Sequence, residues 1–187
     1  MIDLERHYLQ YLAPGYDRNE VLRDLMTTYG DDVWNFAYFL TRRADAADDI
    51  SQEVFLIAYS KLYSFRGECS VKSWLLTIAR NKSLHYLQSA FIRKVTLWDT
   101  VLYRKETSPS AEHIMFERLE TKQLWEHVLT LPRKFREVLI LDYHYGLPMK
   151  EIAELLHVSE GTVKSRLHRA RHKLTALLKH ETEGEGR

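Results

Sequence analysis

Two histidines near the end of the chain, His168 and His172, stand four residues apart. On a helix this spacing places both side chains on one face, where they could hold a metal ion. No glutamate completes an HExxH arrangement, and no third ligand is evident nearby. Because lysines and arginines surround the pair, we interpret the histidines as neighbours of phosphate groups and expect no metal and no cofactor.

The surrounding stretch, SEGTVKSRLHRARHKL at residues 159–174, predicts a helix that reads duplex DNA. Ser159 is a suitable N-cap, and Val163 and Leu167 are placed to face inward. Side chains near the start of such a helix can reach base edges, and later cations can contact phosphates. The alternative is an ordinary amphipathic helix with a cationic, solvated face. The residues left outward are Glu160, Thr162, Lys164, Ser165, Arg166, His168, Arg169 and Arg171.

A short partner helix precedes this one. Lys150–Leu156 places Ile152, Ala153 and Leu156 on one side, and Ala153 is small enough for two crossed helices to approach closely. His157 and Val158 form the turn, with His157 at a position where helix-turn-helix units often have glycine. The two helices therefore predict a helix-turn-helix module.

A second basic cluster lies at residues 65–81, FRGECSVKSWLLTIARN. Ser70 can cap a helix that runs from Val71 to about Gln88, with Trp74 either in its apolar stripe or stacked on a base. Cations beside hydrogen-bonding side chains suit single-stranded or opening DNA, whose backbone needs positive charge and whose exposed bases need a pocket. The candidate contacts are Arg66, Ser70, Lys72, Ser73, Arg80 and Asn81.

An acidic helix face is predicted upstream of this cluster. Asp45 can N-cap a helix whose buried stripe is Ala46, Ile50, Val54, Ile57 and Leu62. The polar residues off that stripe are Asp48, Asp49, Gln52 and Glu53. An acidic surface of this kind favours a basic protein partner.

The elements that position these groups are helices throughout. With 7 Gly and 4 Pro in 187 residues, the chain has long stretches without turn signals. We expect an all-α protein of two small helical modules joined by a flexible linker. Helices are expected at 19–29, ended by Gly30, and at 31–41. The expected ranges are an extension at 1–18, a first module at 19–89, a linker at 90–112, a second module at 113–180 and a tail at 181–187.

Composition narrows the class of protein. The net charge is +1, yet residues 1–60 carry 11 acidic against 5 basic side chains, and residues 61–105 carry 2 against 9. Such blocks suit a chain with a polyanionic partner and a basic one. The single cysteine excludes an internal disulfide. No segment resembles a signal peptide or a bilayer span, so we expect a cytoplasmic protein without membrane insertion.

Three stretches in order, ADAADDISQEVF, FRGECSVKSWLLTIARN and LPRKFREVLILDYHYGLPMKEIAELLHVSEGTVKSRLHRARHKL, resemble the extracytoplasmic-function sigma factors of bacteria. These proteins keep sigma-70 regions two and four, and the resemblance covers residues 17–178. It implies a sigma factor that binds core RNA polymerase, recognises the minus-ten and minus-thirty-five promoter elements and promotes DNA melting. It also implies control by an anti-sigma factor, in many members a membrane-anchored one.

The resemblance assigns roles to particular residues. Asp48, Asp49, Gln52 and Glu53 would dock on the beta-prime clamp helices. Residues 64–70 would capture a base flipped from the minus-ten element, with Lys72, Arg80 and Asn81 on the adjoining DNA. The helix-turn-helix would read the minus-thirty-five element, and an apolar surface at Leu131, Phe135 and Leu139 would serve the beta flap. The linker would run toward the RNA exit channel.

Three other functions are considered from the residues alone, and one of them is a pure interaction protein, such as an inactive sigma-like co-subunit. A helix-turn-helix regulator would bind its promoter without being a polymerase subunit. An enzyme built on the 9 histidines would need ligand spacing, a phosphate loop or a nucleophile elbow, and the sequence offers none of these. We therefore expect no enzymatic activity.

Overall fold

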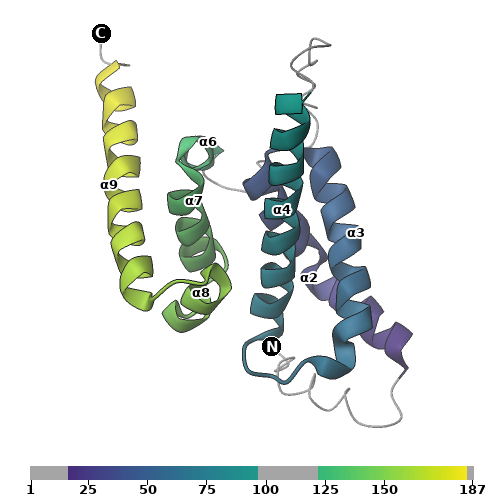
Figure 1. Cartoon of the computed structure of the whole chain (residues 1–187). Helices are drawn as coiled ribbons and strands as arrows, with labels where there is room; N and C mark the ends of the chain where they lie inside the picture. Colours follow the sequence, from purple (N-terminus) through teal and green to yellow (C-terminus); the bar gives the residue numbers. More distant parts are fainter. Residues whose placement is uncertain (1–16, 97–121, 185–187) are drawn as a thin grey trace. The chain divides into compact units, whose positions relative to one another are not determined.

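The computed structural model describes residues 17–96 and 122–184, and within these ranges every regular element is helical. The chain divides into two compact units, Met1–Ser108 and Pro109–Arg187. The division falls inside the range expected for the linker, 90–112. Figure 1 shows the helices of each unit, which are described separately below.

Within residues 17–96, the N-terminal unit forms a bundle of three long helices, each of which packs against the other two: α2 (Arg18–Thr41), α3 (Ala44–Lys61) and α4 (Val71–Thr96). A short turn of helix, η1 (Leu62–Ser64), follows α3. Fully buried Phe36, Val54 and Leu75 bring one side chain from each long helix into the core. Burial of such apolar side chains is the main favourable contribution to the stability of the bundle.

The expected break at Gly30 is wrong, because α2 continues through it without interruption. A glycine inside a helix costs about 1 kcal/mol relative to alanine. The neighbours Tyr29 and Val33 are both buried, and their packing against the bundle outweighs that local cost. The helix ends instead at Thr41, and its C-cap residue Arg42 has a φ of 58°, in the left-handed region.

Arg18 joins the start of α2 to the end of α3. Its Nη2 donates a 2.6 Å hydrogen bond to the carbonyl oxygen of Tyr59, in the last turn of α3. The guanidinium also lies over the rings of Tyr59 and Tyr63, 4.3 and 4.9 Å from their centroids. A charged donor at this position satisfies a helix-end carbonyl that has no partner within its own helix.

Helix α4 extends further than its sequence predicts, reaching Thr96 within the range expected for the linker. Ser70 caps it, since the backbone N–H of Ser73 donates to Ser70 Oγ at 3.1 Å. The buried stripe differs from the expected one. Val71 and Leu75 are buried as predicted, but Trp74 and Ile78 are only half-buried. Leu76 and Ala79 take their place, because α4 contacts both α2 and α3 and so buries a wider face.

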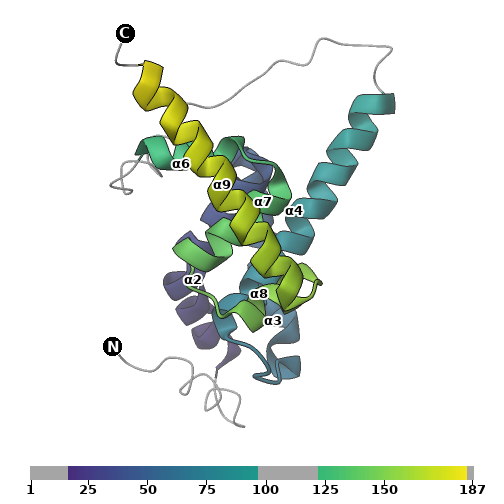
Figure 2. The same cartoon turned by 90° about the vertical axis from the view of Figure 1, so that its left-hand side faces the viewer.

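The C-terminal unit contains α6 (Lys122–Thr130), α7 (Arg133–Leu139), a π-helical turn η2 (Ile140–His144), α8 (Met149–Leu156) and α9 (Glu160–Gly184). Helix α9 packs against α6, α7 and α8 (Figure 2). The side chain of Arg136 is buried, and its Nη1 donates a 2.8 Å hydrogen bond to the carbonyl oxygen of Leu129, which joins α7 to α6.

Helices α8 and α9 form the predicted helix-turn-helix. His157 has a φ of 55°, and the N–H of Val158 donates to the carbonyl oxygen of Ala153 at 3.0 Å, the hydrogen-bond pattern of a left-handed helix end. Ser159 then caps α9, because the N–H of Thr162 donates to Ser159 Oγ at 3.2 Å. The prediction of the cap is confirmed.

Candidate protein and nucleic-acid interfaces

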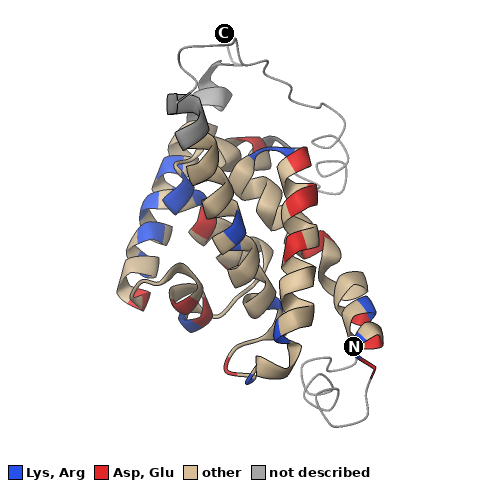
Figure 3. Cartoon of the chain, turned by 45° about the vertical axis from the view of Figure 1, so that its right-hand side comes forward, with Lys and Arg blue, Asp and Glu red and all other residues tan. Residues whose placement is uncertain are grey.

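The acidic face of α3, which we define as Asp48, Asp49, Gln52 and Glu53, consists of exposed residues. Acidic residues gather on the first turns of α3, as the red segments in Figure 3 show. Asp48 accepts a 2.7 Å hydrogen bond from Trp34 Nε1 of α2, and Trp34 stacks on Tyr38 with ring centroids 5.4 Å apart. Glu53 forms an ion pair with Lys82 of α4 at 2.7 Å. The face is therefore held by contacts to both neighbouring helices.

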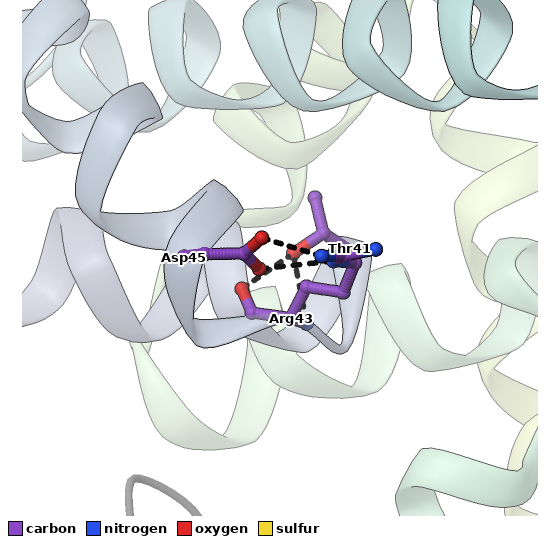
Figure 4. A network of polar contacts seen from close by, with 3 residues as sticks. All are labelled: Thr41, Arg43 and Asp45. Carbon is purple, nitrogen blue, oxygen red and sulfur yellow. Dashed lines mark hydrogen bonds and ion pairs between the residues drawn. The ribbon is translucent and has the colours of Figure 1, made fainter. Parts of the chain in front are cut away.

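Asp45 does not cap α3, contrary to the prediction. The helix begins at Ala44 with Arg43 as its N-cap residue, and Asp45 lies in the first turn (Figure 4). Arg43 Nε donates to Asp45 Oδ1 at 2.9 Å, and this hydrogen bond lowers the pKa of Asp45 below its usual value of 3.8. Thr41 Oγ1 donates to Ala37 O at 2.8 Å and accepts from the N–H of Arg43 at 3.3 Å, which fixes the turn between α2 and α3.

Leu56 is a surface residue that the sequence reading did not single out. It is 68% exposed and follows Gln52 and Glu53 by four and three residues, so it extends the acidic face by one helical turn. A single exposed leucine is common on protein surfaces, but here it lies beside the acidic face and adds apolar area that a bound partner would cover. The signal was available in the sequence, because Leu56 lies outside the buried stripe of α3.

The residues predicted to contact DNA as its strands separate differ in solvent exposure. Arg66 and Asn81 are exposed, and Ser70, Lys72 and Arg80 are half-buried. Lys72 Nζ lies 2.9 Å from Asp32 Oδ2 of α2. These five residues come from the loop after η1 and from the first turns of α4.

The prediction that Ser73 belongs to this set of DNA contacts is wrong. Its side chain is only 2% exposed, because it lies on the side of α4 that packs into the bundle. It therefore presents no hydroxyl to a ligand at the surface. Trp74 packs its ring against that of Phe65, with centroids 4.8 Å apart, so both rings support the loop between η1 and α4.

Helix α9 presents a basic surface, seen as blue segments in Figure 3. Val163, Leu167 and Ala170 are at most 3% exposed and turn one side of the helix into the core. All the residues predicted to face outward do so, with Thr162 and Arg166 half-buried and the others exposed. The exposed ones are Glu160, Lys164, Ser165, His168, Arg169 and Arg171.

The apolar surface expected at Leu131, Phe135 and Leu139 is not present at the surface. These side chains are 4, 6 and 5% exposed and lie in the core of the C-terminal unit. A unit with so few helices needs these side chains for its own core. They are therefore not available to a protein partner.

Two further properties concern the described residues as a group. They contain no cluster of three or more His, Cys, Asp or Glu that could hold a metal ion. Within the same ranges, each helix is too short or too polar to cross a membrane.

The sequence matches two protein-family descriptions, "Sigma-70 region 2" at residues 25–91 and "Sigma-70, region 4" at residues 121–174. The first range covers most of the bundle of α2, α3 and α4, and the second covers α8 and the first part of α9, the two helices of the helix-turn-helix. A region 2 bundle followed by a region 4 helix-turn-helix defines a sigma-70-type protein.

Curated relatives narrow the family. SigM of Bacillus subtilis (strain 168), an ECF RNA polymerase sigma factor, is 31% identical over 157 residues, which covers 82% of this chain and 93% of SigM. SigW of the same organism, also an ECF sigma factor, is 29% identical over 171 residues, covering 86% and 90%. The chain belongs to the extracytoplasmic-function sigma factors of RNA polymerase. It is a transcription-initiation factor that binds core RNA polymerase and promoter DNA.

Solved structures agree with this assignment. The sigma factor RpoE from Bartonella quintana, in complex with the anti-sigma factor NepR, is similar with a TM-score of 0.64 and 25% identity, covering 86% of this chain and 97% of RpoE. CnrH, in complex with the cytosolic domain of CnrY, is similar with a TM-score of 0.67 and 25% identity, covering 95% and 99%.

Proposed function

We propose that the two units divide the work of promoter recognition. The acidic face of α3 docks on the clamp helices of the polymerase beta-prime subunit, and the loop at 65–70 with the start of α4 binds the minus-ten element as it opens. Helix α9 reads the minus-thirty-five element. The observation that supports the proposal best is the buried stripe of Val163, Leu167 and Ala170, because it leaves every predicted reading residue of α9 outward.

Charge supports the first of these contacts. An acidic surface is attracted to a basic partner and repelled by DNA, so the acidic face suits a protein. The exposed side chain of Leu56 adds apolar area that a protein interface can bury. Replacing Asp48 and Asp49 together by lysine should weaken binding to core polymerase by at least tenfold.

The matched control for this experiment reverses two exposed acids elsewhere. Glu20 and Asp24 lie on the first turns of α2, and their replacement by lysine changes the net charge of the chain by the same amount. This control variant should bind core polymerase as the wild type does. Equal losses in both double variants would show that net charge, and not the acidic face, determines core binding.

The contact of α9 with DNA can be tested in the same way. Arg166 and Arg169 follow one another within a turn of the helix, where an arginine can pair with guanine or with phosphate. Replacing both by glutamine should abolish promoter-specific transcription, while the same replacement at exposed Lys134 of α7 should leave it unchanged. Unaltered promoter selectivity in the double variant would contradict the role of α9.

The catalysis of RNA synthesis belongs to the polymerase, and in this proposal the chain performs no bond-making step. Its place of action in this proposal is the cytoplasm, because a sigma factor must act together with RNA polymerase. An anti-sigma factor binds the chain when its promoters are silent, a proposal supported by the complex of the similar sigma factor RpoE with the anti-sigma factor NepR. The tagged chain, purified from uninduced cells, should elute with a regulatory protein and without core polymerase; elution with core polymerase alone would contradict this control.

A further inference from the structure

Arg171 of α9 is held between two side chains of η2. Its Nη2 lies 3.6 Å from Asp142 Oδ2, and its Cζ lies over the ring of Tyr143, 5.3 Å from the centroid. The arginine side chain is 56% exposed and that of Asp142 is 27% exposed. Tyr143 is 62% exposed. The guanidinium is thus oriented on two sides while part of it still faces solvent.

The π-helical turn explains why these two side chains project beside α9. Ile140 and Leu141 are completely buried, which directs the next residues outward. The N–H of Tyr145 donates to Ile140 O at 3.1 Å, and the N–H of Leu147 donates to Leu141 O at 3.0 Å. Single π-helical turns are frequent at functional sites, and this one is the last turn before the helix ends at Tyr145.

Aromatic packing of His144 holds the π-helical turn η2 in place. The His144 ring makes edge contacts with the rings of Trp125 and Tyr145, at centroid distances of 5.3 and 4.7 Å. These rings join η2 to α6. Asp142 and Tyr143 therefore belong to a turn that is packed against α6.

The position of Arg171 on α9 connects this cluster to DNA. Lys164, His168 and Arg171 recur at spacings of four and three residues, so they lie in one row along the helix. The first two are exposed members of the proposed DNA surface. Arg171 is the last member of the row and lies where a helix in the major groove would approach the backbone of the duplex.

We propose that Tyr143 and Asp142 are positioning residues that hold Arg171 against one phosphate beside the minus-thirty-five element. The inference rests on the proposed function of α9. An arginine already oriented loses less side-chain freedom when it binds, so its contact is stronger than that of an unsupported arginine. The carboxylate of Asp142 repels other phosphates, which penalises binding in the wrong register.

The test uses holoenzyme assembled from core polymerase and full-length chain. The probe is a promoter duplex selected by the wild-type holoenzyme from a randomised library, with random-sequence duplex as the comparison. Replacement of Arg171 by glutamine should lower the slope of log affinity against log salt by about 0.9, the value for one lost phosphate contact. Ethylation of one phosphate next to the upstream element should interfere with wild-type binding and not with this variant.

Variants of Tyr143 distinguish a role in positioning Arg171 from a general role in the stability of the fold. Tyr143→Phe keeps the ring under Arg171 and should keep the wild-type affinity and ethylation pattern. Tyr143→Ala should lose up to about fivefold in affinity, the range of an exposed ionic contact. In the Arg171→Gln background, Tyr143→Ala should have no further effect, because Tyr143 acts through the arginine. Asp142→Asn should lower the ratio of promoter to random-sequence affinity.

Several outcomes would overturn the inference while leaving the proposed function intact. Promoter binding by Arg171→Gln with a wild-type salt slope and ethylation pattern would show that Arg171 contacts no phosphate. Additive losses from Tyr143→Ala and Arg171→Gln would show that the tyrosine acts independently. If wild-type holoenzyme selected no promoter from the library, the proposed function itself would fail.

Discussion

Glu53 Oε2 lies 2.7 Å from Lys82 Nζ, so one ion pair joins the acidic face of α3 to α4. The two side chains are 53 and 36% exposed, and an ion pair in this environment contributes at most about 1 kcal/mol to stability. A protein partner that binds Glu53 must compete with Lys82 for the same carboxylate. On the proposal that the acidic face docks on core polymerase, the pair should oppose this binding to a small extent.

This competition predicts an increase in affinity on removal of a lysine. Lys82→Gln should bind core polymerase more tightly, by up to about fivefold, because Glu53 no longer has to leave its partner. Fluorescence anisotropy of labelled chain against core polymerase measures the change. Lys61→Gln, at the exposed end of α3, removes the same charge and should change the affinity less. Equal or weaker binding by Lys82→Gln would contradict the competition.

Leu56 should contribute to core binding without contributing to stability. Leu56→Ala removes an exposed side chain, so the free energy of unfolding should change by less than about 0.5 kcal/mol. Binding to core polymerase should fall by roughly tenfold, since fully burying a leucine side chain contributes about 1.5–3 kcal/mol and truncation to alanine loses part of this. Met26→Ala, which truncates a 50% exposed side chain on α2, serves as the control and should leave core affinity unchanged. Loss of affinity in both variants would contradict a specific role for Leu56.

His157 is a non-glycine residue in the left-handed region, at a φ of 55°. Such a residue costs about 1 kcal/mol, a cost that glycine avoids. His157→Gly should therefore stabilise the C-terminal unit by about 0.5–1 kcal/mol, measured as slower amide hydrogen exchange in α8 and α9. Gly146→Ala, at a φ of 62°, should have the opposite effect. Faster exchange in His157→Gly would show that the histidine side chain stabilises the turn.

Asp45 should give a pH-dependent contribution to the stability of the N-terminal unit. The hydrogen bond from Arg43 lowers its pKa in the folded chain, so the unfolded chain binds the proton more readily. The stabilisation is present above the usual value of 3.8 and is lost as the pH falls through the folded-state pKa. Because the side chain is 63% exposed, we expect less than about 1 kcal/mol at neutral pH.

Calorimetry of Asp45→Asn and wild type checks this prediction. The melting temperature of the variant should be lower at pH 7, and the difference should shrink as the pH falls below 3.8. The same replacement at exposed Asp24 controls for the loss of a charge. A difference that stays constant across this range would show that ionisation of Asp45 is not involved.

Local features of the chain could be predicted from sequence because their causes are local. Ser70 and Ser159 cap their helices as expected, since an N-cap needs only a hydroxyl and the backbone of the next turn. The outward face of α9 followed from the spacing of Val163 and Leu167 in the same way.

The errors concern residues whose surroundings come from distant parts of the chain. Helix α2 continues through Gly30, because the packing of the bundle on both sides of this residue outweighs the low helix propensity of glycine. Ser73 is polar but faces α4's neighbours, and its burial depends on where those helices lie. The Glu53–Lys82 and Asp142–Arg171 pairs each join two elements, so neither could be found from periodicity along one helix.

The central claim is that this chain directs core RNA polymerase to promoters through α3, the loop at 65–70 with α4, and α9. Run-off transcription with purified core polymerase over a promoter library measures it most directly. The account predicts specific transcripts only when the chain is present, from promoters that share two elements at a fixed separation. Binding of those promoters by the chain alone, with no gain in transcription when core polymerase is added, would contradict it and indicate a helix-turn-helix regulator.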